Sequence, residues 1–450
     1  MKMPVNVSSR SASVKVAVIG FLILVLLIPL GMIKGIIVDR QGNASIATRD
    51  IRNSWGGDQT VVGPILGLPY KVEMQTVYGS PYSEEKVVYL LAEELSVMAD
   101  VVAEERYRGL HKVPVFSADI GITGAFRLGA LSSLGIESEH VDWSGAKIFL
   151  GVSDPKAIRK VPVVVANNTS VNFTTSGGGI DGVPSRLSAD LDQLLNSMLS
   201  ESDLVFNISV ALNGSGALQF LPLAENAEVT MSANWHSPSF SGRRLPATRE
   251  IRDDGFDASW HASSLGRKLP AIWIGEQAVR VDTAEDAFGA RFIQPIGLYQ
   301  LVLRATKYGV LFVGLTFVSY FLIEVVGSLV LHPLQYLLVG FANTLFYMLL
   351  LSLAEHVGFD IAYGISAAAS VALISGYSAS ILLRRSRAAL MAAVLTALYA
   401  FLYLTLKAES FALLAGSIGL WIVLAAVMYL TRGINWYAAG ASDQKQTTFD

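Results

Sequence analysis

Long apolar runs dominate the last third of the chain, where only a few polar residues separate one run from the next. These runs cover residues 308–331, 334–354, 361–383, 388–406 and 411–430, and a sixth run, residues 16–38, stands alone near the N-terminus. Each run has roughly the 20 residues that an α-helix needs to cross the hydrocarbon core of a bilayer. The pattern predicts an integral membrane α-helical protein with six transmembrane helices.

Residues 39–307, between the first two apolar runs, have a different pattern. Most of the 34 Lys and Arg residues and of the 37 Asp and Glu residues lie in this stretch, as is typical of a water-soluble domain. Its apolar residues recur at every second position, which predicts β-strands with one buried face. The clearest series are Leu204, Phe206, Ile208, Val210 and Leu212, and Ala227, Val229, Met231, Ala233 and Trp235. We expect a large β-rich domain of the α+β, sandwich-like class, inserted between helices 1 and 2.

One helix and one hairpin stand out inside this domain. Ser188 is a candidate helix N-cap, since apolar residues follow it at helical spacing. These apolar residues are Leu191, Leu194, Leu195, Met198 and Leu199. The turn residues 213–216, Asn-Gly-Ser-Gly, separate two strand-like runs and favour a β-hairpin.

A short internal echo leaves two interpretations open. Residues 120–124 lead to Trp143, and the similar residues 210–214 lead to Trp235. The echo indicates either two similar β-lobes, with a boundary near residues 177–179, or only the generic pattern of strand, turn and strand.

Positive charge predicts how the chain crosses the membrane. Lys2, Arg10 and Lys15 precede the first apolar run without any acidic residue among them, so the positive-inside rule places the N-terminus in the cytoplasm. That run is longer than the apolar part of a signal peptide, which favours an uncleaved anchor. The arginines at 384, 385 and 387 then fall in a cytoplasmic loop, although Arg304 and Lys307 on the outer side run against the rule.

The prediction divides the chain into four parts. Residues 1–38 form the cytoplasmic N-terminus and the first helix, and residues 39–307 form the outer domain. Residues 308–430 form a five-helix transmembrane domain, and residues 431–450 form a cytoplasmic tail.

Composition excludes several kinds of chemistry. The chain has no cysteine, so zinc sites with thiolate ligands and cysteine nucleophiles are excluded. In the outer domain acidic residues outnumber basic ones, which argues against the binding of nucleic acid or other polyanions. The six His residues are scattered. We therefore expect no catalytic site, no metal and no cofactor.

Three motifs resemble functional sites, and each has a plainer interpretation. Residues 177–182 match G-x-G-x-x-G, but Pro184 separates them from the next helix, so we interpret them as a loop. Ser144 and Lys147 have the S-x-x-K spacing of penicillin-recognising enzymes, but the residues that follow read as a strand. Trp235 and Trp260, each followed by His, suggest sugar stacking, whereas a Trp on a sandwich face is more often core.

Within the apolar runs Glu324 is the foremost candidate for function, because a carboxylate in a spanning helix is costly. We favour a structural pair with the arginines of residues 384–387 and keep proton or ion handling as the alternative. His332 precedes Pro333, a typical helix start, and Asn343 is expected to bond another helix. The candidate functional residues are Glu324, His332, Glu355, His356 and Arg432.

Many short segments resemble the CreD family of bacterial inner-membrane proteins. The resemblance spans nearly the whole chain, is strongest from Arg304 onward, and departs from the family at Ala354 and Asn435, where Ser and Asp are expected. The segments are residues 55–56, 63–66, 106–109, 238–242, 255–260, 304–308, 332–340, 346–347, 352–359, 362–363, 412–414, 416–417, 428–429, 431–432 and 436–437, with Glu324 and Glu409.

The resemblance implies an inner-membrane protein that supports cell envelope integrity. It also implies a link to a sensor-kinase and response-regulator pathway and to sensitivity to β-lactams and colicins, and it supplies no catalytic residue. We expect a protein that is not an enzyme, contacts the lipid bilayer and binds an unknown envelope protein or cell-wall component. The alternative is a transporter or lipid-handling protein that uses Glu324.

Overall fold

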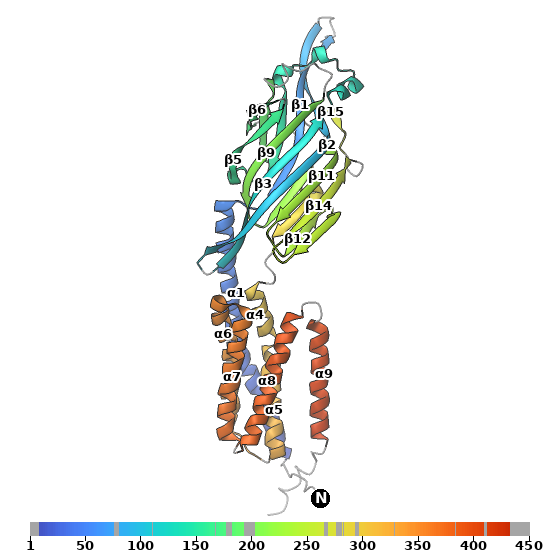
Figure 1. Ribbon diagram of the computed structural model, residues 1–450. Coiled ribbons are helices and arrows are strands. Elements are labelled where there is room, and N and C mark those ends of the chain that lie inside the picture. The colour runs from blue at the N-terminus through green and yellow to red at the C-terminus, as the bar shows by residue number, and fades with distance from the viewer. Residues whose placement is uncertain are drawn as a thin grey trace, which may run out of the picture. The chain divides into compact units, whose positions relative to one another are not determined.

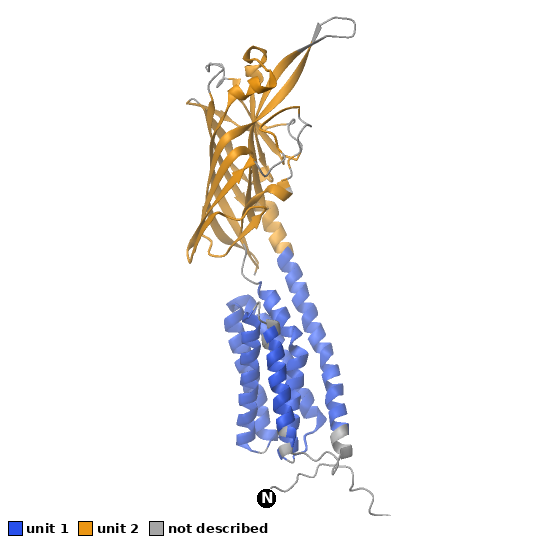
Figure 2. Cartoon of the chain, turned by 90° about the vertical axis from the view of Figure 1, so that its right-hand side faces the viewer, with its two compact units in different colours: residues 1–45, 296–450 blue, residues 46–295 orange. Residues whose placement is uncertain are grey.

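A computed structural model shows two compact units, one formed by residues 1–45 with 296–450 and the other by residues 46–295 (Figure 2). The first unit is helical and the second is built of strands. The structure describes residues 9–75, 81–109, 111–166, 168–176, 182–192, 203–264, 269–275, 281, 283–292, 297–327, 329–382, 384–408 and 412–432.

The helices of the first unit follow the apolar runs of the sequence. They are α1 (Ser9–Trp55), α4 (Leu298–Lys307), α5 (Gly309–Gly327), α6 (Pro333–Val357), α7 (Phe359–Ile381), α8 (Arg385–Lys407) and α9 (Ala412–Thr431). α1 continues past residue 38, where the first apolar run ends, and its last residues belong to the strand-rich unit. α4 belongs to the helical unit.

Four helices, α1, α6, α7 and α8, are long and apolar enough to span a membrane. The pair α4 and α5 is bent by 43° at Tyr308 and supplies a fifth span if it counts as one. The apolar stretch found in α9, Gly416–Tyr429, is shorter than the length required of a span. A membrane protein with several spanning helices is therefore confirmed, and the sixth span stays a prediction.

The described residues of the second unit contain sixteen strands in one connected sheet. They are β1 (Gln59–Gln75), β2 (Pro81–Arg108), β3 (His111–Phe126), β4 (Lys147–Val152), β5 (Ile158–Ala166), β6 (Thr169–Asn172), β7 (Thr174–Thr175), β8 (Arg186–Asp190), β9 (Leu204–Gly214), β10 (Ala217–Pro222), β11 (Ala224–Ala233), β12 (Pro238–Gly242), β13 (Thr248–Arg252), β14 (Gly255–Ser263), β15 (Ile272–Ile274) and β16 (Phe288–Phe292). Short helices accompany them: η1 (Leu128–Leu134), η2 (Ser138–His140), η3 (Trp143–Gly145), η4 (Pro155–Ala157) and α3 (Thr283–Asp286).

The long strand β2 divides the sheet into two halves (Figure 1). Residues 81–91 pair antiparallel with β1, which also pairs with β4 and β10. Residues 94–108 pair antiparallel with β3, and residues 92–101 pair in parallel with β11 on the other side. The second half has the order β14, β11, β2, β3, β9 and β5.

The core lies between these two halves, as expected for a sandwich-like domain. The alternating residues of β9 and β11 are buried as the sequence predicts, for example Phe206 and Val229. Trp260 of β14 is fully buried, and its ring centroid lies 6.1 Å from that of Phe288 on β16. Aromatic contacts thus join strands of different halves.

Two of the sequence predictions inside this unit are wrong. Ser188 lies in β8 and not at a helix N-cap; its predicted partners Leu194, Leu195, Met198 and Leu199 lie outside the described residues. Residues 213–216 do not close a hairpin, because β9 pairs with β3 and β5 whereas β10 pairs with β1 and β16. Gly216 there has φ +93°, which lets the chain turn away between the two halves.

The internal echo does not divide the unit into lobes. Ile120 and Val210, which begin the two similar segments, are paired neighbours on β3 and β9. Residues 46–295 also form a single compact unit. The echo therefore reflects two adjacent strands of one sheet, and most of the boundary suggested near residues 177–179 lies outside the described residues.

Candidate functional site

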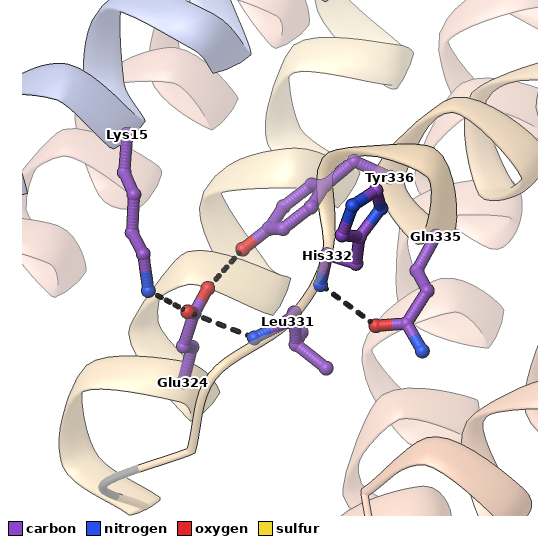
Figure 3. Close-up of polar contacts among 6 residues, drawn as sticks. All are labelled: Lys15, Glu324, Leu331, His332, Gln335 and Tyr336. Carbon is purple, nitrogen blue, oxygen red and sulfur yellow. Dashed lines mark hydrogen bonds and ion pairs between the residues drawn. The ribbon is translucent and has the colours of Figure 1, made fainter.

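Glu324 is the centre of a polar cluster inside the helical unit (Figure 3). Its side chain is only 3% exposed and forms an ion pair with Lys15 of α1. The hydroxyl of Tyr336 on α6 donates to Oε2 at 2.8 Å, and the backbone N–H of Leu331 donates to Oε1 at 3.1 Å. The carboxylate therefore joins α1, α5 and α6.

The local sequence explains why three partners meet Glu324. α5 ends at Gly327, and α6 begins only at Pro333, so the chain between them must satisfy its own backbone donors. His332 caps α6: its Nδ1 accepts the N–H of Leu334 at 3.2 Å, while its own N–H donates to Gln335 Oε1 at 3.0 Å. His332 therefore starts a helix, as its place before Pro333 indicates.

The partner of Glu324 is not the one that the sequence favours. Arg387 of the 384–387 segment donates to the carbonyl oxygen of Gly327 at 3.1 Å, one turn beyond Glu324. A Cβ on Gly327 would lie 2.8 Å from the Arg387 guanidinium, so glycine permits this close approach. Lys15 forms the ion pair with Glu324 because the start of α1 lies at the same end of the helical unit. The two residues are 309 positions apart, so no local sequence pattern predicts this contact.

Glu355, near the opposite end of α6, forms a second polar cluster. Tyr299 of α4 donates to its carboxylate at 3.0 Å, and Arg40 of α1 lies 3.9 Å away. Nearby in the sequence, Asp360 of α7 pairs with Lys407 of α8 at 2.7 Å. Both ends of the bundle are therefore held by charged or polar contacts between helices.

Buried polar side chains also lie between these ends. Tyr399 donates to Asn343 Oδ1 at 3.2 Å, so Asn343 bonds another helix as predicted. Tyr363 donates to the carbonyl oxygen of Tyr399 at 2.7 Å, and Tyr320 shares a hydrogen bond with Ser378. These contacts tie α5, α6, α7 and α8 together inside the bundle.

The remaining candidates occupy separate, exposed positions. The Nδ1 atom of His356 lies 3.0 Å from the carbonyl oxygen of Ser352 on the same helix. The guanidinium of Arg432 lies 4.0 Å from the ring centroid of Tyr429, again one turn away. The structure thus brings Glu324 and His332 to one end of α6 and Glu355 and His356 to the other, and it assembles no single site from the five.

The motifs of the strand-rich unit that resemble functional sites, S-x-x-K and the Trp-His pairs, do not form catalytic or sugar-binding sites. Ser144 donates to Asp142 Oδ1 at 2.5 Å, whereas Lys147 pairs with Asp190 at 3.0 Å, so Lys147 does not activate Ser144. The hydrogen bond from Ser144 lowers the pKa of Asp142 below its ordinary value. Trp260 is fully buried, which removes the sugar-stacking hypothesis at that position.

Trp235 is only 6% exposed and stacks on His236, whose ring lies at 5.8 Å, so it too belongs to the core. Among the residues that the structure describes, no group of three or more His, Asp and Glu side chains is placed to hold a metal ion. The G-x-G-x-x-G motif lies outside the described residues apart from Gly182.

The apolar helices, the polar contacts between them and the large strand-rich unit define an integral membrane protein. A family model described as "Inner membrane protein CreD" matches residues 11–437. The chain is also similar to the "Inner membrane protein CreD" of Escherichia coli (strain K12), with 33% identity over 429 residues that cover 92% of each chain. The chain belongs to the CreD family of inner-membrane proteins.

Proposed function

We propose that this protein supports the integrity of the bacterial cell envelope by binding a protein partner or an envelope component in the periplasm. The observation that carries the proposal is the outer face of β14, β11, β2, β3, β9 and β5, which holds three open grooves. An accessible, grooved face on a large folded domain is suited to binding. The link to a two-component pathway and to β-lactam and colicin sensitivity belongs to the same proposal, as does the absence of enzymatic activity.

The arrangement of basic residues supports an orientation with both termini in the cytoplasm. Lys15, near the start of α1, pairs with Glu324, and Arg387, in the first turn of α8, donates to Gly327 one turn away, so basic residues at the starts of α1 and α8 lie at one end of the helical unit. Basic residues concentrate on the cytoplasmic side of inner-membrane proteins. The proposal therefore has six spanning helices, an outer domain of residues 39–307 and a cytoplasmic tail from residue 431.

A transporter that uses Glu324 is not favoured. A carboxylate that moves protons or ions must exchange with water, whereas Glu324 is buried and held by Lys15, Tyr336 and the Leu331 N–H. We expect Glu324→Gln to support envelope integrity as well as the wild type.

The absence of cysteine gives a direct test of the orientation. Single cysteines are introduced at the exposed positions Leu245 and Arg385 of the full chain. A membrane-impermeant maleimide added to intact spheroplasts should label Leu245→Cys, and it should label Arg385→Cys only after the inner membrane is opened. Labelling of Arg385→Cys in intact spheroplasts contradicts the orientation.

Complementation tests the function itself. Deletion of the gene should raise sensitivity to detergent and to β-lactams, and the wild-type chain should restore resistance. Ser144→Ala and Lys147→Ala should restore it equally, because neither residue acts on the cell wall in this proposal. A deletion strain with unchanged sensitivity contradicts the role in envelope integrity. A Lys147→Ala protein that fails to restore resistance contradicts the proposal that Lys147 has no catalytic role.

A further inference from the structure

The outer face of six neighbouring strands forms one continuous surface in the strand-rich unit (Figure 1). The side chains of β2 alternate along this surface: Leu95, Val97 and Ala99 point into the core, whereas Ser96, Met98 and Asp100 are exposed. The paired residues of β11, β3 and β9 keep the same alternation. We call this surface, on β14, β11, β2, β3, β9 and β5, the acidic face.

Met98 stands at the centre of the acidic face. The strand register places it in a row with Thr230 and Ser259 on one side and with Gly121 and Ser209 on the other. Neighbouring strands are about 4.8 Å apart, so these small side chains leave space on both sides of Met98. Met98 is 60% exposed and forms the wall shared by two grooves of about 490 and 450 Å³.

A third groove of about 690 Å³ lies farther along β2. Together the grooves cross the whole width of the face. They are lined mostly by small residues of the strands, with Glu94, Glu228, Arg244 and His261 in the third groove. None of the described residues that line the three grooves is Phe, Tyr or Trp, so the grooves offer no aromatic side chain on which a sugar ring could stack.

Charge on this face is unbalanced at its centre. Glu94, Asp100 and Glu228 lie on the neighbouring strands β2 and β11, and within the described part of the chain none of them forms an ion pair. Three basic side chains line the grooves: Lys160 on β5, Arg249 on β13, and Arg244, which lines the third groove together with Glu94 and Glu228. The carboxylates that line the grooves outnumber them, because Asp119, Glu250 and Asp257 add to Glu94, Asp100 and Glu228. A negative centre repels polyanions and attracts cations.

Exposed apolar side chains accompany these carboxylates. Val205 of β9 and Val161 of β5 are 62% and 59% exposed, and Val102 of β2 follows Met98 and Asp100 on the same side of its strand. Protein interfaces combine apolar anchors with charged rims, and Met adapts to partners of irregular shape. A free ion or a small polar solute would gain nothing from the apolar side chains.

We propose that the acidic face binds a partner protein through a basic segment, in which Lys or Arg residues flank an apolar side chain that packs against Met98. The carboxylates of Glu94, Asp100 and Glu228 bind the cationic groups, and the segment lies in the two grooves beside Met98. This inference rests on the proposed function and names the partner class of the same surface.

Photo-crosslinking in living cells tests the inference. Benzoylphenylalanine replaces Met98 in the full-length chain, and mass spectrometry identifies the peptide to which position 98 is joined. We expect one recurring protein segment rich in Lys and Arg. The same amino acid at Leu134, which is exposed outside this face on η1, should not capture that segment.

Charge variants give the decisive comparison. The triple change Glu94→Gln, Asp100→Asn and Glu228→Gln should lower the yield of that crosslink about tenfold, because three exposed charge pairs are lost. A control triple, Glu85→Gln, Glu137→Gln and Glu139→Gln, removes the same charge at exposed positions outside this face and should leave the yield unchanged. Higher salt during crosslinking of isolated membranes should also lower the yield, since salt screens exposed charges.

Other outcomes overturn the inference. The first is a crosslink from position 98 to lipid, to glycan, to a second copy of this chain or to an acidic segment. The second is an equal crosslink yield in the two triple variants. The third is that positions 98 and 134 give the same products. The proposed function is judged separately by complementation with the deletion strain. If the wild type restores the envelope but no basic segment is captured, the function stands and only the acidic face loses its role.

Discussion

The helical unit and the strand-rich unit treat polar side chains in opposite ways. In the helical unit the buried polar groups include Glu324, Asn343, Ser366 and Ser378, and several of them connect helices. The strand-rich unit has an almost entirely apolar core, and its charged residues lie on exposed faces. A membrane offers a helix no water, so polar groups must find partners inside the bundle.

This difference predicts which substitutions lower the stability of each unit most. The strand-rich unit should suffer most from lost volume in its core, because burial of apolar surface stabilises it. The helical unit should suffer most when one member of a polar pair is removed and the other stays buried.

The largest effect is expected for Trp260→Ala in the strand-rich core. Trp260 is fully buried between Phe240 and Phe288, and its loss leaves a large cavity. The free energy of unfolding should fall by about 3–5 kcal/mol. Chemical unfolding of the detergent-solubilised chain, followed by the circular dichroism of its strands, measures it. Leu245→Ala, at a residue that is 72% exposed, should change little, and equal effects of both changes contradict an apolar core at Trp260.

The next effect is expected for Lys15→Ala in the helical unit. Glu324 then keeps a buried charge without its cation, which should lower stability by about 2–3 kcal/mol, less than for a fully buried pair because Lys15 is partly exposed. Thermal unfolding in detergent measures it. The double variant Lys15→Ala with Glu324→Gln should recover part of the loss. If the double variant is no better than Lys15→Ala alone, the two side chains are not coupled.

A smaller effect is expected for His332→Ala, which removes the cap of α6. The N–H of Leu334 loses its acceptor, at a cost of about 1 kcal/mol. The same thermal assay detects the change. His332→Ser should retain most of the stability, because Ser is a favourable N-cap. A Ser variant as unstable as the Ala variant would assign His332 a role other than capping.

The smallest effect concerns pH and the exposed carboxylate Asp257. Hydrogen bonds from Ser232 and then Arg252 lower the pKa of Asp257 below its ordinary value. Its contribution to stability is therefore complete above about pH 4, the unfolded pKa, and is lost as the pH falls towards the lower folded pKa. Chemical unfolding of the wild type and of Asp257→Asn should differ near neutral pH and converge in acid. A difference that grows in acid reverses the sign and contradicts these contacts.

The sequence predicts the helices better than the sheet, for a physical reason. A spanning helix is specified by consecutive residues, so the predicted run 334–354 lies inside the observed α6, Pro333–Val357. Strand faces are also local, and the alternation of β9 is confirmed at each of its predicted core residues. Strand pairing is not local: the turn-like residues 213–216 predict a hairpin, yet β10 pairs with the distant β1.

The candidate site shows the same limit. A charged residue in an apolar run identifies Glu324, and Pro333 identifies the helix start at His332. The ion-pair partner is missed, since charge alone does not distinguish Lys15 from the arginines near residue 385. Tyr299 and Tyr336 are missed too, because nothing in the sequence around a tyrosine indicates the distant carboxylate to which it donates.

The length of β2 has a consequence for how the domain is made. Residues 92–101 of β2 pair in parallel with β11, and the Thr230 hydroxyl donates a hydrogen bond to the carbonyl oxygen of Val97, 133 positions earlier in the chain. During synthesis β2 and β3 precede β11, and until β11 has been made one edge of β2 has unpaired backbone groups. Such delayed pairing slows folding and exposes the nascent chain to aggregation. Incomplete chains should therefore depend on chaperones until the segment that contains β11 has been made.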